Sequence, residues 1–202
     1  MMWSVGILAG GKSSRMGRDK SFVELAGQAV IEHVIERVTN LGQQETFVIT
    51  NRPTAYRHLG LVMVSDLVPE KGSLGGIYTA ITHSPTDWVL VVACDMPFLS
   101  STLLQHMVSL IQESSFDVIV PRVEGHPQGL HALYHKRCLD PIREQIEQDR
   151  LKVIGYYDQV RVRYLDESEY QGYDPEGWAF FNLNSPADLA DARRVAKNSR
   201  PL

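Results

Sequence analysis

Short apolar segments of strand length alternate with amphipathic segments along most of the chain, and this alternation limits the possible folds more than any other sequence feature. The apolar segments are Trp3–Leu8, Thr46–Ile49, Leu61–Val64, Trp88–Ala93 and Val118–Val120. Apolar strands separated by helices are typical of a parallel sheet covered on both faces. We therefore predict a three-layer α/β fold with a mostly parallel central sheet. In such sheets ligands bind beyond the carboxyl ends of the strands.

Helical spacing of apolar residues predicts several of the helices. It recurs over Ala29–Leu41, Ser100–Glu113 and Ala187–Lys197. We expect Ser185 to be the N-cap of the last of these helices. Val160–Leu165 alternates in polarity and predicts an edge strand.

Composition narrows the class of protein. The 202 residues contain no repeat or linker, so we predict one domain over 1–202. A net charge of −4 disfavours a nucleic-acid partner. Two distant cysteines, Cys94 and Cys138, fit a reducing compartment, and we expect Cys94 to be a small buried residue. Neither a signal peptide nor a membrane span of ~18 apolar residues is evident, so we expect a cytoplasmic protein without a membrane partner.

A glycine-rich, basic segment, Leu8–Lys20, follows the first expected strand. Gly10 and Gly11 allow a sharp turn that brings backbone N–H groups close to a phosphate. Four cations lie within nine residues: Lys12, Arg15, Arg18 and Lys20. This charge density suits a bound triphosphate, and the alternative is a glycine turn with solvated charges.

An overlapping segment, Gly6–Ser13, also satisfies the P-loop pattern GxxxxGK[ST]. On that interpretation the chain is a small ATP-dependent kinase in which Lys12 is indispensable. The first strand would then end at Val5, and apolar residues would lie in an exposed phosphate loop. We expect instead that the strand continues to Leu8.

Two carboxylates follow other expected strands. Asp66 comes after Leu61–Val64 and precedes Gly72–Gly76, whose glycines would let the chain pass close to a base or a sugar. Asp95 comes after Trp88–Ala93, where a buried carboxylate is costly unless it is paired. Mg²⁺ held by this carboxylate and by substrate phosphates would provide the pairing. The alternative is that each carboxylate lies in an ordinary loop that caps the next helix.

These segments together resemble a known family. Leu8–Lys20 is similar to the LAGGxSxRMGxDK signature of small nucleotidyltransferases, and above all to the molybdenum cofactor guanylyltransferases. Later motifs of that family are matched in the same order by Gly72–Gly76, Ala93–Phe98, Gly125–Pro127 and Phe181–Pro186. The resemblance implies a Rossmann-like, nucleotide-diphospho-sugar transferase-like fold. It also implies transfer of GMP from GTP to the phosphate of molybdopterin (Mo-molybdopterin).

The resemblance implies residue roles at the nucleotide. Backbone groups of one short segment would hold the guanine nucleotide: Leu8, Ala9 and Gly10. Asp66 would contact the nucleotide as well, and either Thr50 or Asn51 would add a further contact. Ser73, Ala93 and Met96 depart from the family motifs, but none of them removes a charged group.

For the transfer step the resemblance implies that Lys20 lies beside the nucleotide phosphates, and we expect Arg15 near it, where both would stabilise the departing pyrophosphate. Asp95 would bind both the nucleotide and Mg²⁺, and Asn182 and Asn184 would lie toward the pterin. The expected substrates are GTP and molybdopterin, the expected cofactor is Mg²⁺, and transient contacts with cofactor-biosynthesis or acceptor proteins are expected.

Three other functions compete with this interpretation. A related cytidylyltransferase is disfavoured because Gly10 stands where cytidylyl relatives typically have a second Ala. The P-loop pattern would make the chain a kinase. A nucleotide-sensing protein without catalysis would not need Lys20 and Asp95, which are both present.

Overall fold

The computed structural model describes residues 1–10, 20–113 and 115–198. Their central sheet has the strand order β10-β7-β9-β6-β1-β4-β5, and β8 pairs with β7 beside this path. The strands are β1 (Trp3–Leu8), β4 (Thr46–Ile49), β5 (Val62–Val64), β6 (Trp88–Ala93), β7 (Val118–Val123), β8 (His126–Pro127), β9 (His131–His135) and β10 (Val162–Leu165). Four neighbouring pairs on the path are parallel, and only β9 runs against its two neighbours. The predicted mostly parallel sheet is therefore confirmed.

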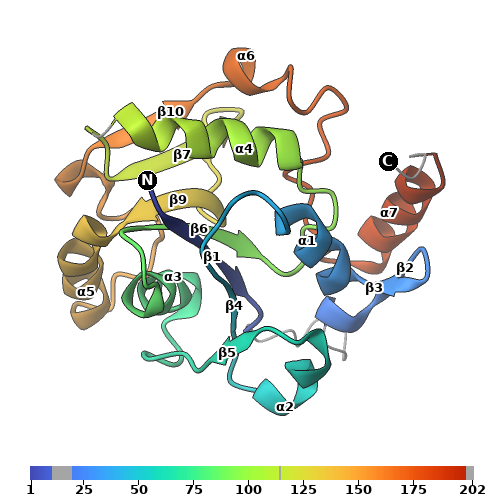
Figure 1. Ribbon diagram of the computed structural model, residues 1–202, viewed down its shortest axis with the longest axis horizontal. Helices are drawn as coiled ribbons and strands as arrows, with labels where there is room; N and C mark the ends of the chain where they lie inside the picture. The colour runs from blue at the N-terminus through green and yellow to red at the C-terminus, as the bar shows by residue number, and fades with distance from the viewer. Residues whose placement is uncertain (11–19, 114, 199–202) are drawn as a thin grey trace.

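Helices cover both faces of the sheet (Figure 1). One face packs against α1 (Val30–Val38) and α4 (Ser101–Ser109), and the other packs against α3 (Gly72–His83) and α5 (Leu139–Glu147). Strand β6 contributes to both cores because its side chains alternate between the two faces. The three predicted layers follow from this arrangement.

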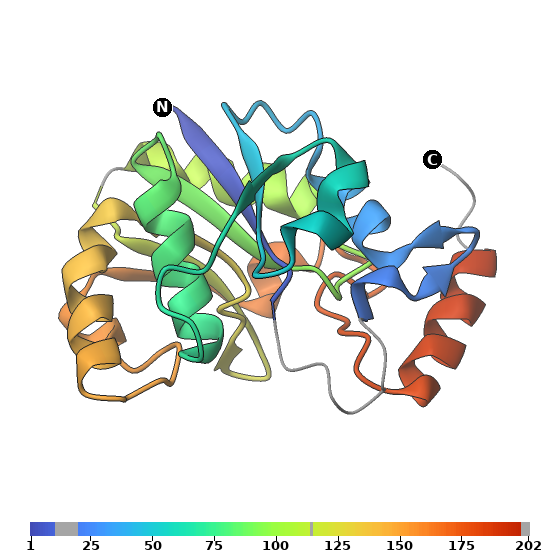
Figure 2. The same cartoon turned by 90° about the horizontal axis from the view of Figure 1, so that it is seen from below.

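A small third core lies beside the main sheet. It joins the hairpin of β2 (Glu24–Leu25) and β3 (Gln28–Ala29) to α7 (Pro186–Asn198). In Figure 2 this hairpin and α7 lie at one end of the molecule, with α5 at the other. A 3-10 turn, η1 (Lys20–Phe22), leads into the hairpin. This third core therefore supports the segment that begins at Lys20.

The remaining helices are short. They are α2 (Pro53–Tyr56), which follows β4, and α6 (Glu167–Tyr170), which follows β10. In the described part of the chain no helix is long and apolar enough to cross a membrane.

Gly6 lies in the middle of β1, where it pairs with Phe47 and Val91. A Cβ at this position would lie 3.0 Å from the Cβ of Ala80 on α3, so glycine allows the helix to approach the strand. A P-loop would require this glycine at the end of its strand. The P-loop interpretation is therefore wrong, because β1 continues to Leu8.

Several expected boundaries differ by a few residues. The Ala29–Leu41 helix is formed only over Val30–Val38, and α4 is followed by a 3-10 turn at Leu110–Glu113. Ser185 caps α7 as expected, since its Oγ accepts a hydrogen bond from the Asp188 N–H at 3.2 Å. Val160–Leu165 contains β10, which is an edge strand of the sheet as predicted.

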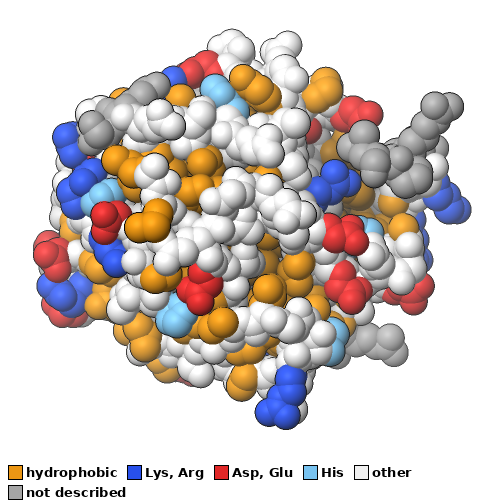
Figure 3. Space-filling view, viewed as in Figure 1, with side chains coloured by type: hydrophobic (Ala, Val, Ile, Leu, Met, Phe, Trp, Pro, Cys, Tyr) orange, Lys and Arg blue, Asp and Glu red, His pale blue; other side chains and the backbone are white. Residues whose placement is uncertain are grey.

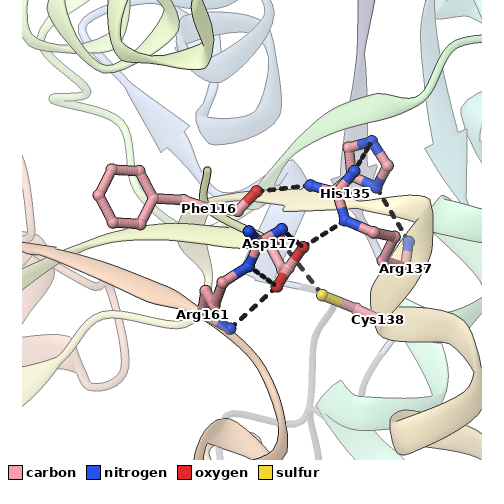
Figure 4. Close-up of polar contacts among 6 residues, drawn as sticks. All are labelled: Phe116, Asp117, His135, Arg137, Cys138 and Arg161. Carbon is pink, nitrogen blue, oxygen red and sulfur yellow. Dashed lines mark hydrogen bonds and ion pairs between the residues drawn. The ribbon is translucent and has the colours of Figure 1, made fainter. Parts of the chain in front are cut away.

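An ion-pair cluster around the buried carboxylate of Asp117 lies at the start of β7 (Figure 4). Asp117 precedes β7 and accepts hydrogen bonds from the side chains of Arg137 and Arg161. Burial would raise the pKa of Asp117, but the bonds from the two guanidinium groups lower it to about 2. The Arg137 guanidinium also donates to the Phe116 carbonyl at 2.8 Å, and the Cys138 thiol donates to the Asp117 carbonyl at 3.3 Å. This cluster fastens β7, β10 and the segment after β9.

Candidate active site

A cavity of about 230 Å³ opens at the carboxyl edge of the parallel strands. Its walls come from the segments after β1, β4, β5 and β6, from η1, and from the first turns of α3. The lining residues from these segments are Leu8, Ala9, Gly10, Lys20, Ser21, Thr50, Asn51, Arg52, Asp66, Gly72, Ser73, Gly76, Ala93, Cys94 and Asp95. This is the edge at which the sequence predicts ligand binding.

Six of the seven predicted site residues line this one cavity. They are Leu8, Ala9, Gly10, Lys20, Asp66 and Asp95. The seventh, Arg15, lies outside the described residues, as do Lys12 and Arg18. Residues that are distant in the sequence are therefore brought together where the resemblance places the nucleotide.

Backbone bonds to both neighbouring strands fix the floor of the cavity. The Ala9 N–H donates to the Ile49 carbonyl at 2.9 Å, and the Cys94 N–H donates to the Leu8 carbonyl at 3.1 Å. Gly76 of α3 lies against the Leu8 side chain, and a Cβ at Gly76 would be 3.0 Å from a Leu8 methyl carbon. Glycine at this position therefore lets α3 lie close over the end of β1.

Asp66 is held firmly in one wall. Its Oδ1 accepts hydrogen bonds from the Thr79 hydroxyl at 3.0 Å and from the Val68 N–H at 3.1 Å. Its own N–H donates to Oδ1 of Asn51 at 3.0 Å. Asn51 is exposed in the cavity, whereas Thr50 is buried with its hydroxyl accepting from the N–H of Arg52. Of the two residues left open by the sequence, Asn51 has the side chain better placed to meet a ligand.

Lys20 and Asp95, two of the charged residues that line the cavity, form a pair of opposite charge. Burial raises the pKa of the Asp95 carboxyl, and the nearby Lys20 charge opposes this effect. The Lys20 Nζ donates to Oδ1 of Asn184 at 2.8 Å, and the Leu183 N–H donates to the Asp95 carbonyl at 2.9 Å. The segment before α7 therefore contacts both residues. Asn182, in contrast, turns its amide to the Phe180 carbonyl and does not line the cavity.

No group of three His, Cys, Asp or Glu side chains that could hold a metal ion by themselves occurs in the ranges the structure describes. Asp95 nevertheless fits a site for Mg²⁺, because this ion is commonly held by one or two carboxylates together with substrate phosphates. Its carboxylate is largely desolvated and lines the cavity beside a lysine. A cation shared with a phosphate would offset the cost of that burial.

The cavity residues Ser21, Arg52 and Cys94 were not predicted from the sequence as site residues, and neither were the apolar Ile49 and Leu130. Cys94 was expected to be a small buried residue, but it is partly exposed in the cavity. The available signal in the sequence was adjacency: Ser21 follows Lys20, Arg52 follows Asn51 and Cys94 precedes Asp95. On the face shown in Figure 3, Lys and Arg side chains lie among Asp and Glu.

Comparison with known proteins identifies the family. The model of the MobA-like NTP transferase domain matches residues 5–161. A probable molybdenum cofactor guanylyltransferase of Pelotomaculum thermopropionicum is 39% identical over 194 residues, covering 96% of this chain and 93% of that protein. The molybdenum cofactor guanylyltransferase of Vibrio campbellii is 35% identical over 185 residues, covering 91% of each chain. The chain belongs to the molybdenum cofactor guanylyltransferase family.

A solved structure supports this membership. The molybdopterin-guanine dinucleotide biosynthesis protein A of Archaeoglobus fulgidus matches with a TM-score of 0.85 and 27% sequence identity, covering 97% of this chain and all of that one. The resemblance in the sequence is therefore confirmed, and this guanylyltransferase-family chain is a nucleotidyltransferase with the expected nucleotide-diphospho-sugar transferase-like fold.

Proposed function

We propose that this protein transfers GMP from GTP to the phosphate of molybdopterin and releases pyrophosphate. The observation that carries the proposal is the gathering of Leu8, Ala9, Gly10, Lys20, Asp66 and Asp95 around one cavity. The names of the relatives supply the nucleotide and the acceptor. In the proposed step an oxygen of the molybdopterin phosphate bonds to the α-phosphorus of GTP, and the bond from this phosphorus to the β-phosphate oxygen breaks.

The chain's own contribution is positioning and charge. The Leu8 carbonyl and the Ala9 N–H are used in bonds to the residue after β6 and to β4, so the backbone groups of Leu8, Ala9 and Gly10 outside these bonds are the ones that meet the nucleotide. Asp66 offers its remaining carboxylate oxygen to a sugar hydroxyl. Lys20 has three donors on its ammonium group and uses one on Asn184, so two are left for phosphate oxygens. Holding reacting groups in place lowers the barrier without a covalent intermediate on the protein.

Asp95 is the residue we assign to the metal. When bound, Mg²⁺ neutralises phosphate charge and polarises the phosphorus that is attacked. The protein does not need a nucleophile of its own, because the acceptor phosphate is already ionised at neutral pH. Arg15 is proposed to act with Lys20 on the leaving pyrophosphate.

The proposal also covers the partners and the cellular location of the protein. Molybdopterin and the proteins that supply it or receive the product are the proposed partners, and the cytoplasm is the proposed location. Both cysteines are free thiols, which suits a reducing compartment.

The test is direct product formation. Purified protein is incubated with molybdopterin, Mg²⁺ and one of GTP, CTP or ATP, and pyrophosphate release and the mass of the product are measured. We expect product from GTP alone, and its loss in Asp95→Ala, whereas the surface variant Asp158→Ala keeps full activity. Product from CTP instead would establish the cytidylyltransferase alternative, and absence of product from every nucleotide would refute nucleotidyl transfer to this acceptor.

A further inference from the structure

A chain of hydrogen bonds leads from the buried Tyr56 through Ser21 to Cys94, and its last two members line the cavity. The Tyr56 hydroxyl donates to Ser21 Oγ at 3.0 Å, and Ser21 Oγ donates to Cys94 Sγ at 3.1 Å. Tyr56 ends α2, Ser21 lies in η1, and Cys94 follows β6. These segments are separated by at least 35 residues in the sequence, so only the fold brings them together.

The members of this chain adjoin residues to which we assign substrate contacts. Ser21 directly follows Lys20, and Cys94 directly precedes Asp95. Ser21 and Cys94 also line the cavity themselves. A change in the Ser21–Cys94 contact would therefore change the distance between the lysine and the carboxylate of the charged pair.

Burial gives this contact its rigidity. Ser21 is 1% exposed and Tyr56 is fully buried, with the Phe22 ring 4.8 Å from the Tyr56 ring. Sulfur is a weak acceptor, so the bond to Cys94 is a poor source of stability compared with apolar packing. What a directional bond adds at this position is a fixed relative placement of η1 and the end of β6.

Two contacts from the segment before α7 also act on Lys20 and Asp95. Asn184 holds only the tip of the Lys20 side chain, in an exposed position. The Leu183 N–H holds the backbone of Asp95 from the side of α7. The hydrogen bond from Ser21 to Cys94 instead joins the two residues that are next to Lys20 and Asp95 in the sequence.

We propose that Ser21 is a positioning residue that sets Lys20 against Asp95 through its hydrogen bond to Cys94. This inference rests on the proposed function, since it assigns Lys20 and Asp95 to the nucleotide phosphates and the metal. Ser21 does not touch the reacting atoms, and its effect passes through the two residues beside this bond.

The first test compares two buried serines. Ser21→Ala removes both the bond to Cys94 and the acceptor of the Tyr56 hydroxyl. We expect kcat for GMP transfer to fall at least fivefold while the thermal midpoint falls by about as much as in the control. The matched control is Ser4→Ala, because Ser4 is also fully buried and its hydroxyl lies 3.0 Å from that of Thr86 at the opposite end of β1. Equal kcat values in Ser21→Ala, Ser4→Ala and the unaltered protein would overturn the proposal.

A second readout separates positioning from a general structural role. GTP affinity is measured by calorimetry for Ser21→Ala, Lys20→Ala and the double variant. We expect Ser21→Ala to weaken GTP binding at least threefold when Lys20 is present. In the Lys20→Ala background we expect Ser21→Ala to have no further effect. Fully additive effects would contradict action through Lys20.

Cys94 provides the rescue test. Cys94→Ser keeps an acceptor for the Ser21 hydroxyl and is expected to retain kcat within about twofold, whereas Cys94→Ala should lose activity as Ser21→Ala does. Equal losses in both Cys94 variants would overturn the role of the hydrogen bond. Failure of the unaltered protein to transfer GMP would instead refute the proposed function, so the two failures are distinguishable.

Discussion

The Lys20 Nζ donates a hydrogen bond to Oδ1 of Asn184 at 2.8 Å, joining residues 164 positions apart in the sequence. Lys20 stands in η1 and Asn184 precedes α7, so the contact brings the C-terminal part of the chain to the cavity. The same C-terminal segment holds the backbone of Asp95 through Leu183. The charged pair of the cavity therefore depends on residues near the end of the described chain.

Asn184→Ala is expected to lower kcat/KM for GMP transfer about tenfold, because a hydrogen bond to a charged group contributes about 1.5 kcal/mol or more. Steady-state kinetics with GTP checks this expectation. Gln148→Ala is the control, since the Gln148 amide donates to Glu144 on the surface of α5. An Asn184→Ala enzyme as active as this control would show that the contact with Lys20 is not used in the reaction.

Asp95→Asn is expected to stabilise the ligand-free protein at neutral pH while lowering activity on the order of 100-fold or more. The folded pKa of Asp95 is raised by burial, so the folded state binds more protons than the unfolded state between the two pKa values. The free energy of unfolding therefore falls as the pH rises and Asp95 ionises. Asparagine does not ionise, so this decrease is absent in Asp95→Asn. Thermal unfolding between pH 4 and 8 measures the gain, which should vanish at the acid end. A lower midpoint for Asp95→Asn at pH 8 would contradict this account.

Asp117 is expected to have the opposite effect on stability. Burial opposes the bonds from Arg161 and Arg137, which still lower its pKa to about 2, so the stability it contributes is present above the unfolded value near 4 and is lost as pH falls toward 2. Asp117→Asn should cost about 2 kcal/mol at pH 7, as measured by urea unfolding. Asp140→Asn is the matched control, because Asp140 pairs with Arg143 on the exposed surface of α5 and should cost little. Equal losses in the two variants would refute the assignment.

His131 is expected to make the protein sensitive to mild acid. Its ring is fully buried, and within the described ranges the ring nitrogens make no well-aligned hydrogen bond, although the Ala179 backbone lies close enough to oppose the effect of burial on the pKa. Burial lowers its pKa to about 3, so the unfolded state takes up a proton first and stability falls as pH drops below 6.5. At pH 5 this loss is about 2 kcal/mol, and His131→Leu should remove it. Urea unfolding at pH 7.5 and pH 5 tests this, with the exposed His126→Gln as control; an unchanged pH dependence in His131→Leu would count against the burial effect.

Gly6→Ala is expected to destabilise the protein by about 1–3 kcal/mol, because its Cβ would lie 3.0 Å from the Ala80 Cβ. Replacing Ala80 with glycine in the same chain should recover part of the loss. Chemical unfolding of the two single variants and the double variant measures this coupling. Strictly additive losses would show that α3 does not meet β1 at this point.

The sequence predicts much of the fold because buried parallel strands are apolar on both faces. Trp3–Leu8 and Trp88–Ala93 have the predicted bounds, and Asp95 lies beyond the second of them. The inserted strand β9 was not predicted, since its pairing with β6 and β7 is antiparallel and non-local. Helix α5 was missed too, because its apolar face is narrow and charged residues surround it.

The candidate site, like the fold, could be predicted only in part from the sequence. Residues in motifs could be singled out from the sequence, as with Lys20 and Asp66, and both line the cavity. Ser21 and Cys94 could not be paired, since 73 positions separate them and neither carries a charge. Hydrogen bonds between neutral side chains leave no pattern in the sequence, so their partners are known only from the fold.

The central claim is that the cavity around Lys20 and Asp95 holds a guanine nucleotide. The most direct measurement is thermal unfolding with Mg²⁺ and GTP, CTP or ATP, on the unaltered protein, Lys20→Ala and the exposed control Lys152→Ala. Ligand at a hundred times its dissociation constant adds ~2.7 kcal/mol, or roughly 5–11 °C for a domain of this size. The account predicts such a shift with GTP alone, retained in Lys152→Ala and lost or strongly reduced in Lys20→Ala. An equal shift with all three nucleotides, or a GTP shift unaffected by Lys20→Ala, would contradict it.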